Sequence, residues 1–345
     1  MRPTLRYLVA LGALLLASSL VLPGFFNGPY PHPPGPVLDR EVSHLYLHEI
    51  QSQRPDLVLL GDSLLTKGVD QPLLQTRLEV PTYKLDIPGS SSALCYLVLR
   101  SNIVPAEHAP RTLVILFRDT LLTAPAFRTT GPYFGLIDKF ARPSDSLLLE
   151  RAYLSQLTPV QVTLERWFPP YTYRLEMRES IDAGLRHLLP AFFACDRGCA
   201  DDALAGVMGD VQPGLFARSI RLAESGLYVP AQLDFNARVE GSFLPEIIRL
   251  AGERGIRLVF VRAPTNIFPD ASLQPPGLDL YMKALDDYLA ARSIPLLDLS
   301  RVDGIGPAQF IDPHHLNPEG KYIFTLALAA ALQPYVEPWR SPNGK

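Results

Sequence analysis

The apolar run Leu57-Val58-Leu59-Leu60 is followed at once by the polar turn Gly61-Asp62-Ser63. An unbroken apolar run that ends at a glycine is typical of a strand buried on both faces of a parallel sheet. A serine at the turn from such a strand into a helix has an exposed hydroxyl, and nearby backbone N–H groups point outward. Because Gly-Asp-Ser is also common in ordinary turns, this segment alone does not identify a site.

The surrounding chain alternates strands with helices. Further strands are expected at 83–87, 112–117, 257–261 and 295–299, and helices at 70–78, 90–102, 243–254, 278–292 and 318–335. This alternation predicts a doubly wound α/β fold, a mostly parallel sheet between two helical layers with right-handed crossovers.

The N-terminal segment 1–27 is predicted to be a membrane anchor. Arg2 and Arg6 precede an uncharged apolar run from Leu8 to Leu22, which extends to Phe26. The stretch from Tyr7 to Phe26 is just long enough to span a bilayer, with the arginines on the cytoplasmic side. A cleaved signal peptide is the alternative, because small residues stand at 17–19. We favour the uncleaved anchor, which places the main domain in the periplasm or outside the cell.

Beyond the anchor we divide the chain into five parts. They are a Pro-rich tether at 28–36, the first part of the α/β domain at 37–119, a helical insertion or cap at 120–234, the second part of the domain at 235–338, and a tail at 339–345. The insertion is assigned because it has helical patches and aromatic clusters but no convincing buried strand. Such insertions commonly form lids, although a purely structural role fits equally well.

Composition excludes several classes of partner. The formal net charge is −3, so no excess of positive charge attracts nucleic acid. His44 and His48 share one face of a predicted helix, but they lack a third ligand, and a polar helix face is the better interpretation. We therefore expect no metal ion and no cofactor.

The three cysteines fit an exported chain. Cys195 and Cys199 are separated by three residues and are predicted to form a disulfide in an oxidising compartment. Cys95 lies in an apolar run, where a small buried thiol is expected.

A second polar cluster, Asp312-Pro313-His314-His315, stands just before the last predicted helix. An aspartate three residues before a histidine in a tight loop can hold the imidazole Nδ1, so that Nε2 accepts a proton. Helix capping beside a solvated histidine is the alternative. Together with Ser63 at another strand end, Asp312 and His315 supply an orienting acid, a base and a nucleophile.

The order of these pieces resembles the SGNH, or GDSL-type, hydrolase superfamily over residues 56–117 and 257–335. In that family an early Gly-Asp-Ser carries the nucleophile and a late Asp-x-x-His carries the acid and base, which implies catalytic roles for Ser63, Asp312 and His315. Residues 85–91 resemble the second conserved segment of that family, which supplies a glycine N–H. This resemblance implies that the N–H groups of Gly89 and Ser63 form an oxyanion hole.

This sequence departs from the family's third block, where an asparagine normally completes the oxyanion hole. Arg118 occupies that position. Its guanidinium either replaces the missing donor, with Asp119 holding it in place, or makes a structural ion pair that leaves a slower site. Substrate contacts are expected from the polar residues Asp62, Arg262 and Asn266, although ordinary loop polarity explains them equally well.

The resemblance implies a serine-dependent esterase or O-acyltransferase that forms an acyl-serine. The anchored, exported layout also resembles accessory acyl-transfer proteins that work beside membrane-bound O-acyltransferases, which suggests acetyl-like esters of a cell-envelope polysaccharide as substrates. The alternative is a weak or inactive scaffold that binds a polymer or a membrane O-acyltransferase.

Overall fold

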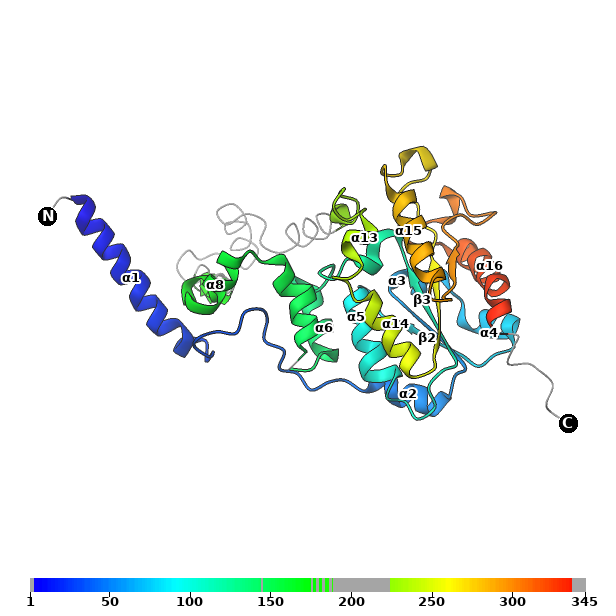
Figure 1. Ribbon diagram of the computed structural model, residues 1–345, viewed down its shortest axis with the longest axis horizontal. Coiled ribbons are helices and arrows are strands. Elements are labelled where there is room, and N and C mark those ends of the chain that lie inside the picture. The colour runs from blue at the N-terminus through cyan, green and yellow to red at the C-terminus, as the bar shows by residue number, and fades with distance from the viewer. Residues whose placement is uncertain are drawn as a thin grey trace. The chain divides into compact units, whose positions relative to one another are not determined.

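The computed structural model describes residues 3–143, 145–174 and 224–336, together with 176, 177, 180, 181, 184, 185 and 188. The chain forms two compact units. One comprises Met1–Val37 and Tyr153–Arg221, and the other Leu38–Ala152 and Leu222–Lys345. The predicted segment 120–234 is thus shared between the two units. Figure 1 shows the central sheet and its helices in the second unit.

The second unit is built on a five-stranded parallel sheet of order β2-β1-β3-β4-β5. This is one of the two common doubly wound orders, and it confirms the predicted fold class. β5 is an edge strand that pairs over only three residues, which explains why it is shorter than expected. The strands are β1 (Leu57–Gly61), β2 (Thr82–Asp86), β3 (Thr112–Phe117), β4 (Arg257–Arg262) and β5 (Leu296–Asp298).

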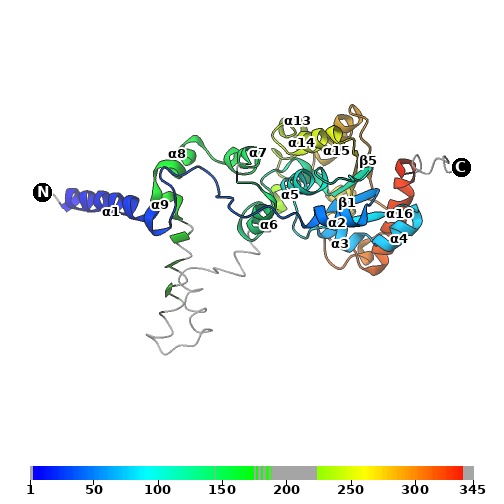
Figure 2. The same ribbon diagram turned by 90° about the horizontal axis from the view of Figure 1, so that it is seen from below.

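Helices cover both faces of the sheet (Figure 2). Alternate residues of β1, β3 and β4, such as Leu59, Leu116 and Val261, pack in one apolar cluster with α3 (Ser63–Gly68), α4 (Gln71–Leu78) and α16 (Pro318–Val336). The opposite face carries α2 (Leu45–Gln53), α5 (Ser92–Val98), α14 (Leu244–Glu253) and α15 (Leu278–Ala290). Because both faces are covered, β1, β3 and β4 each contain an unbroken buried apolar run, as the sequence predicts.

Short helical segments complete the second unit. The helix expected over 90–102 is observed as α5 followed by a wider π turn, η1 (Leu99–Ile103). The remaining short elements are η2 (Asp119–Thr123), η3 (Gly131–Tyr133), α6 (Phe134–Phe140), α7 (Ser146–Leu148), η4 (Leu149–Tyr153, which runs into the first unit), α13 (Phe235–Arg238), η6 (Ala271–Leu273) and η7 (Pro307–Gln309).

The first unit contains α1 (Pro3–Phe25), η5 (Leu154–Gln156), α8 (Pro159–Trp167) and α9 (Pro169–Thr172). In the part of the chain that the structure describes, α1 is the one helix long and apolar enough to cross a membrane, which fits the predicted anchor. Its orientation in a membrane stays a prediction. Cys195 and Cys199 lie outside the described residues, whereas Cys95 is buried and its thiol pKa is raised to about 12 by burial.

Candidate active site

The candidate site lies at the edge where the parallel strands end. β1 leads through Asp62 into Ser63, β2 leads towards Gly89, and β3 leads directly into Arg118. Because the carboxyl ends of parallel strands share one edge of a sheet, these residues are brought together from three separate parts of the chain. The loop before α16 approaches the same edge and carries His315.

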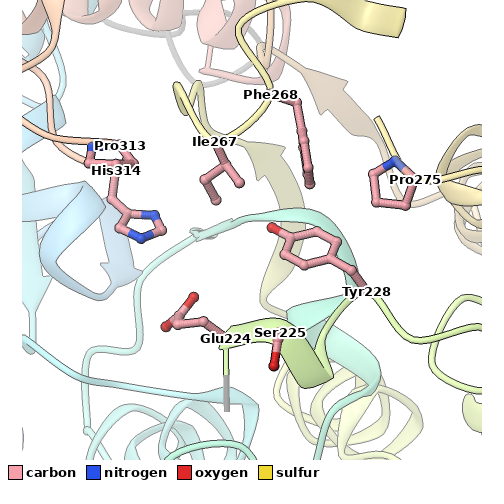
Figure 3. Close-up of a pocket in the computed structure, with 8 residues that line it drawn as sticks. All are labelled: Glu224, Ser225, Tyr228, Ile267, Phe268, Pro275, Pro313 and His314. Carbon is pink, nitrogen blue, oxygen red and sulfur yellow. The ribbon is translucent and has the colours of Figure 1, made fainter. Parts of the chain in front are cut away.

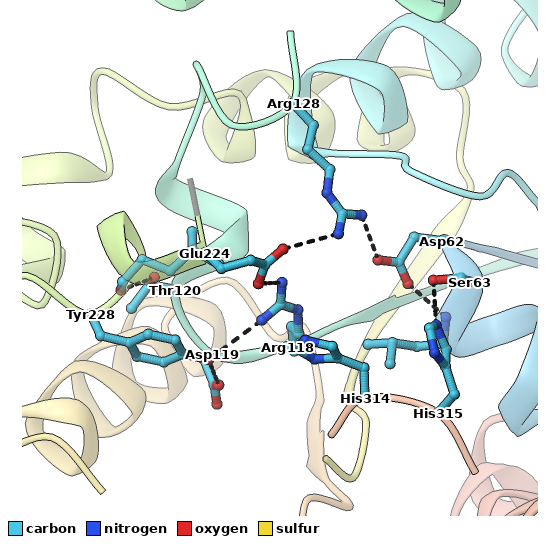
Figure 4. Close-up of polar contacts among 12 residues, drawn as sticks. Asp62, Ser63, Arg118, Asp119, Thr120, Arg128, Glu224, Tyr228, His314 and His315 are labelled. Carbon is cyan, nitrogen blue, oxygen red and sulfur yellow. Dashed lines mark hydrogen bonds and ion pairs between the residues drawn. The ribbon is translucent and has the colours of Figure 1, made fainter. Parts of the chain in front are cut away.

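Ser63, His315 and Asp312 form a continuous chain of hydrogen bonds. Ser63 Oγ lies 2.8 Å from His315 Nε2 (Figure 4). On the other side of the ring, His315 Nδ1 lies 2.7 Å from Asp312 Oδ2. Both distances are within hydrogen-bond reach, with the serine hydroxyl donating to Nε2 and Nδ1–H donating to the carboxylate. This is the arrangement of a nucleophile, a general base and an orienting acid.

Local hydrogen bonds position the two ends of this chain. Asp62 caps α3, since its side chain accepts the N–H of Leu64 at 2.9 Å, and this fixes Ser63 as the first residue of the helix. On the other side, Asn317 Oδ1 accepts the N–H of Gly320 at 2.9 Å near the start of α16. The N–H of Ile311 donates to the carbonyl oxygen of His315 at 2.9 Å, which closes the loop that carries the acid and base.

The environment of Asp312 keeps its carboxylate ionised. Burial acts to raise the pKa of Asp312, but hydrogen bonds from His315 Nδ1 and from the backbone N–H groups of His314 and His315 together lower it below its ordinary value. The carboxylate is therefore charged at neutral pH. It holds the imidazole by one oxygen and its own loop by the other.

The expected backbone donors of an oxyanion hole are also present. Gly89 has a φ of +83°, a left-handed conformation that strongly favours glycine. An added Cβ there would lie 2.7 Å from Tyr133 Cε1, so the aromatic ring packs directly against this backbone. The N–H groups of Ser63 and Gly89 have no hydrogen-bond acceptor among the described residues.

Arg118, at the position of the missing asparagine, is buried with 2% of its side chain exposed. It forms an ion pair with Glu224, and its Nη1 lies 3.5 Å from the hydroxyl of Tyr228. Burial acts to lower the pKa of Arg118, but Glu224, Tyr228 and Asp62 together outweigh it and the pKa is raised. The expectation that Asp119 holds Arg118 is wrong, because Asp119 instead accepts from Tyr228 and from Arg262.

Glu224 links Arg118 to the residue before the serine. Its second oxygen accepts from Arg128 at 3.0 Å, and Arg128 in turn lies 3.6 Å from Asp62 (Figure 4). Burial acts to raise the pKa of Glu224, but the two arginines together lower it. The predicted ligand residue Asp62 is therefore engaged within the protein, as the cap of α3 and as the last member of an alternating row of charges.

Two further predicted contacts have structural partners. Arg262 is buried and donates to Asp119 at 2.7 Å and to Asp298 at 3.1 Å, so its guanidinium is occupied inside the protein, contrary to the expected substrate contact. The N–H of Asn266 donates to the carbonyl oxygen of Pro313 at 2.8 Å. This bond ties the loop after β4 to the loop that carries His315.

A cavity of about 370 Å³ adjoins the loop that carries the triad residues Asp312 and His315, and His314 of that loop lines it (Figure 3). Its walls are mostly apolar, and the ring of Tyr228 packs edge-on against Phe268 at 5.0 Å. His314 Nδ1 is buried and has no partner among the described residues. Burial and the nearby Arg118 lower the pKa of His314. The lining residues are Glu224, Ser225, Tyr228, Ile267, Phe268, Pro275, Pro313 and His314.

Sequence reasoning missed Glu224 and Tyr228. Neither belongs to a motif, and each is more than 100 residues from Arg118 along the chain. A buried arginine requires a partner carboxylate, but the sequence contains 35 aspartates and glutamates and no spacing rule that selects one of them. No group of three His, Cys, Asp or Glu side chains within the described residues is arranged to hold a metal ion.

Comparisons with known proteins find likenesses of fold. No protein-family model and no curated protein matches the sequence. A Bacteroides fragilis protein described as an acylhydrolase has 13% identity and a TM-score of 0.41, covering 86% of this chain and 100% of its own. A GDSL-like lipase of Bacteroides thetaiotaomicron has 12% identity and a TM-score of 0.38, covering 82% of this chain and 87% of its own. The sheet order, and the meeting of Ser63, Asp312 and His315 at the carboxyl ends of its strands, match the arrangement expected from the sequence.

Proposed function

We propose that this chain is a serine-dependent esterase or O-acyltransferase that acts through an acyl-serine at Ser63. The observation that carries the proposal is the hydrogen-bonded chain from Ser63 through His315 to Asp312. Two hydrogen bonds of 2.8 and 2.7 Å join the serine, the imidazole and the carboxylate in sequence at the carboxyl edge of the sheet. Their simplest purpose is to activate the hydroxyl.

The geometry supports a two-step acyl transfer. Ser63 Oγ attacks the ester carbonyl carbon while His315 Nε2 takes the hydroxyl proton, and Asp312 stabilises the resulting imidazolium. The N–H groups of Ser63 and Gly89 donate to the oxyanion. When the tetrahedral intermediate collapses, the C–O bond to the alcohol breaks and His315 returns the proton to the leaving oxygen. Water or a sugar hydroxyl then attacks the acyl-serine, with His315 again as the base.

The cavity beside the triad supports an acylated carbohydrate as substrate. The aromatic rings of Tyr228 and Phe268 offer apolar surfaces to a sugar ring, and His314 offers a hydrogen-bonding group at its edge. A mostly apolar wall with few polar groups is typical of small-molecule sites. Together with the candidate anchor α1, this favours acetyl-like esters of an exported cell-envelope polysaccharide, in the periplasm or outside the cell and beside a membrane-bound O-acyltransferase.

The state of Arg118 favours a second candidate, a weak or inactive scaffold. Its guanidinium is occupied by Glu224 rather than held free for an oxyanion. Loss of one oxyanion donor lowers turnover by about 10²- to 10³-fold in a serine hydrolase. A site with two backbone donors alone would therefore be slow, and binding of a polymer or a membrane acyltransferase would be its main role.

A fluorophosphonate probe separates the two candidates. We expect the purified full-length chain to be labelled on Ser63, and Ser63→Ala to abolish labelling with unchanged thermal unfolding. Ser225→Ala is the matched control, because Ser225 lines the neighbouring cavity but lies outside the triad, and it should keep the label. Hydrolysis of p-nitrophenyl acetate with and without a sugar acceptor then separates esterase from transferase. A folded chain that is not labelled would establish the scaffold instead.

A further inference from the structure

The first unit places a short amphipathic helix at one end of the apolar helix α1. With 23 residues, α1 is about 35 Å long, slightly more than the roughly 30 Å hydrocarbon core of a bilayer. When α1 spans a membrane, its last residue, Phe25, and the adjoining Phe26 lie at the level of the lipid headgroups. Any segment packed on these two residues lies at the same level.

The α8–α9 pair is packed there (Figure 2). The ring of Tyr173, directly after α9, stacks on Phe26 with centroids 5.1 Å apart and is buried. The N–H of His32 donates to the carbonyl oxygen of Arg166 in α8 at 3.1 Å. Tyr30 meets Trp167 edge-on at 6.3 Å. These contacts all lie within one compact unit, so α8 is held near the end of α1 through α9 and through the tether residues Tyr30 and His32.

One face of α8 is apolar, and two of its three residues are exposed. Val160, Leu164 and Trp167 stand at positions i, i+4 and i+7, which share one side of a helix. In this structure 67% of Val160 and 53% of Trp167 is exposed. Such a face is costly in water but matches the membrane interface, where tryptophan and tyrosine are enriched.

The charges of α8 fit the same placement. Glu165 is neutralised by Arg174 at 2.9 Å. Arg166 is exposed and its guanidinium lies 5.8 Å from the centre of the Trp167 ring, so its positive charge is available to lipid phosphates. A basic side chain beside an exposed tryptophan is typical of helices that lie in the interface plane.

We propose that α8 lies in the membrane–water interface, with Val160, Leu164 and Trp167 inserted among the lipids as a second attachment next to α1. The placement follows from the packing of α9 and Tyr173 on the end of α1 and of α8 on α9 and the tether, and it is independent of the catalytic proposal. It depends on α1 being an uncleaved span, and the experiment below includes that condition.

The fluorescence of Trp167 can report the depth of α8 in the membrane. The chain has two tryptophans, and Trp339→Phe makes Trp167 the single tryptophan. We expect the full-length variant in phosphatidylcholine vesicles to be quenched by lipids brominated near the headgroup more than by lipids brominated deep in the acyl chain. Leu14→Trp, added to a chain that lacks both tryptophans, places a reporter at the middle of α1 and should show the opposite order. Quenching of Trp167 by aqueous acrylamide alone, with Leu14→Trp quenched by deep bromines, would overturn the proposal. Absence of bromolipid quenching at both positions would also overturn it, because α1 would then not span.

A charge on the proposed buried face provides a second test. Val160→Asp should abolish the bromolipid quenching of Trp167, although an acidic residue in the first turn stabilises the helix itself. Leu280→Asp is the matched control, because Leu280 is an exposed leucine of α15 in the other unit, and it should leave the quenching unchanged. Equal quenching in Val160→Asp and the parent would contradict the insertion of this face.

Discussion

Replacing Glu224 by glutamine should destabilise the second unit strongly, although Glu224 stands outside the sheet and outside every motif. The substitution keeps the shape of the side chain and removes the charge that balances Arg118, whose side chain is 2% exposed. Removing one partner of a buried ion pair costs about 3–5 kcal/mol, because the other charge stays buried without compensation. Since 17% of Glu224 is exposed, we expect the lower end, about 3 kcal/mol.

The substitution removes a carboxylate from two arginines. Arg128 loses its 3.0 Å contact with Glu224 but keeps Asp62 at 3.6 Å, so only Arg118 is left without a paired carboxylate. At about 2–4 °C per kcal/mol for a unit of this size, a loss of about 3 kcal/mol lowers Tm by about 6–12 °C. Thermal unfolding followed by circular dichroism in detergent micelles measures this shift. Glu246→Gln is the control, because Glu246 pairs with an Arg249 that is half exposed, and such pairs contribute less than about 1 kcal/mol.

Two further measurements test the cause. Arg118→Met combined with Glu224→Gln removes both charges and should be more stable than Glu224→Gln alone, because replacing a whole buried pair is often neutral. The folded-state pKa of Glu224 is lowered, so its stabilising contribution is present above the ordinary glutamate value of about 4.3 and is lost as the pH falls through the folded pKa. The Tm values of the parent and Glu224→Gln should therefore converge in acid. A Tm of Glu224→Gln within 1 °C of the parent at pH 7, or a double variant that loses the sum of both single losses, would refute the ion-pair reasoning.

Three more substitutions test the site itself. Asp312→Asn keeps an acceptor for the backbone but presents an amide N–H to His315, which favours the wrong tautomer, so kcat/KM for p-nitrophenyl acetate should fall by about 10⁴-fold with little change in Tm. Gly89→Ala places a Cβ 2.7 Å from the Tyr133 ring at a φ of +83°, and a loss of at least about 1 kcal/mol on chemical denaturation is expected together with reduced hydrolysis. Arg118→Asn introduces the amide donor that SGNH hydrolases carry at this position, and Glu224 keeps Arg128 as its partner. Ester hydrolysis should therefore be kept or increased. A loss of more than tenfold in a folded sample would show that Arg118 itself serves the reaction.

The parts of the site that the sequence predicts are those whose geometry is local. The position of Ser63 follows from the apolar run before it, since a buried strand that ends at Gly61 can only deliver the next residues to the sheet edge. The relation of Asp312 to His315 follows from their spacing of three residues in one tight loop. The parallel sheet then brings both segments to the same edge, so the alternation of strands and helices was sufficient to predict that they meet.

The parts that the sequence does not predict depend on partners distant in the chain. Arg262 was expected to face a ligand because it ends β4 at the correct edge, but two carboxylates occupy its guanidinium. Asp119 follows Arg118 directly in the chain, which suggests that the two pair. Its side chain instead accepts from Arg262 and from Tyr228, which lies 109 residues away. A polar side chain at a strand end indicates that it has a partner, but periodicity and spacing do not indicate which one.

The arginine that follows β3 also connects the oxyanion side of the site to the neighbouring cavity. An asparagine there would be neutral and would need no counter-charge, whereas a buried guanidinium requires a carboxylate close by. Glu224 supplies it, and Glu224 and Tyr228 both line the cavity beside the triad. The same two side chains therefore hold the end of β3, through Arg118 and Asp119, and shape the wall that a substrate would meet. A change at Arg118 should thus alter substrate preference as well as rate, because Glu224 and Tyr228 both contact Arg118 and line the cavity.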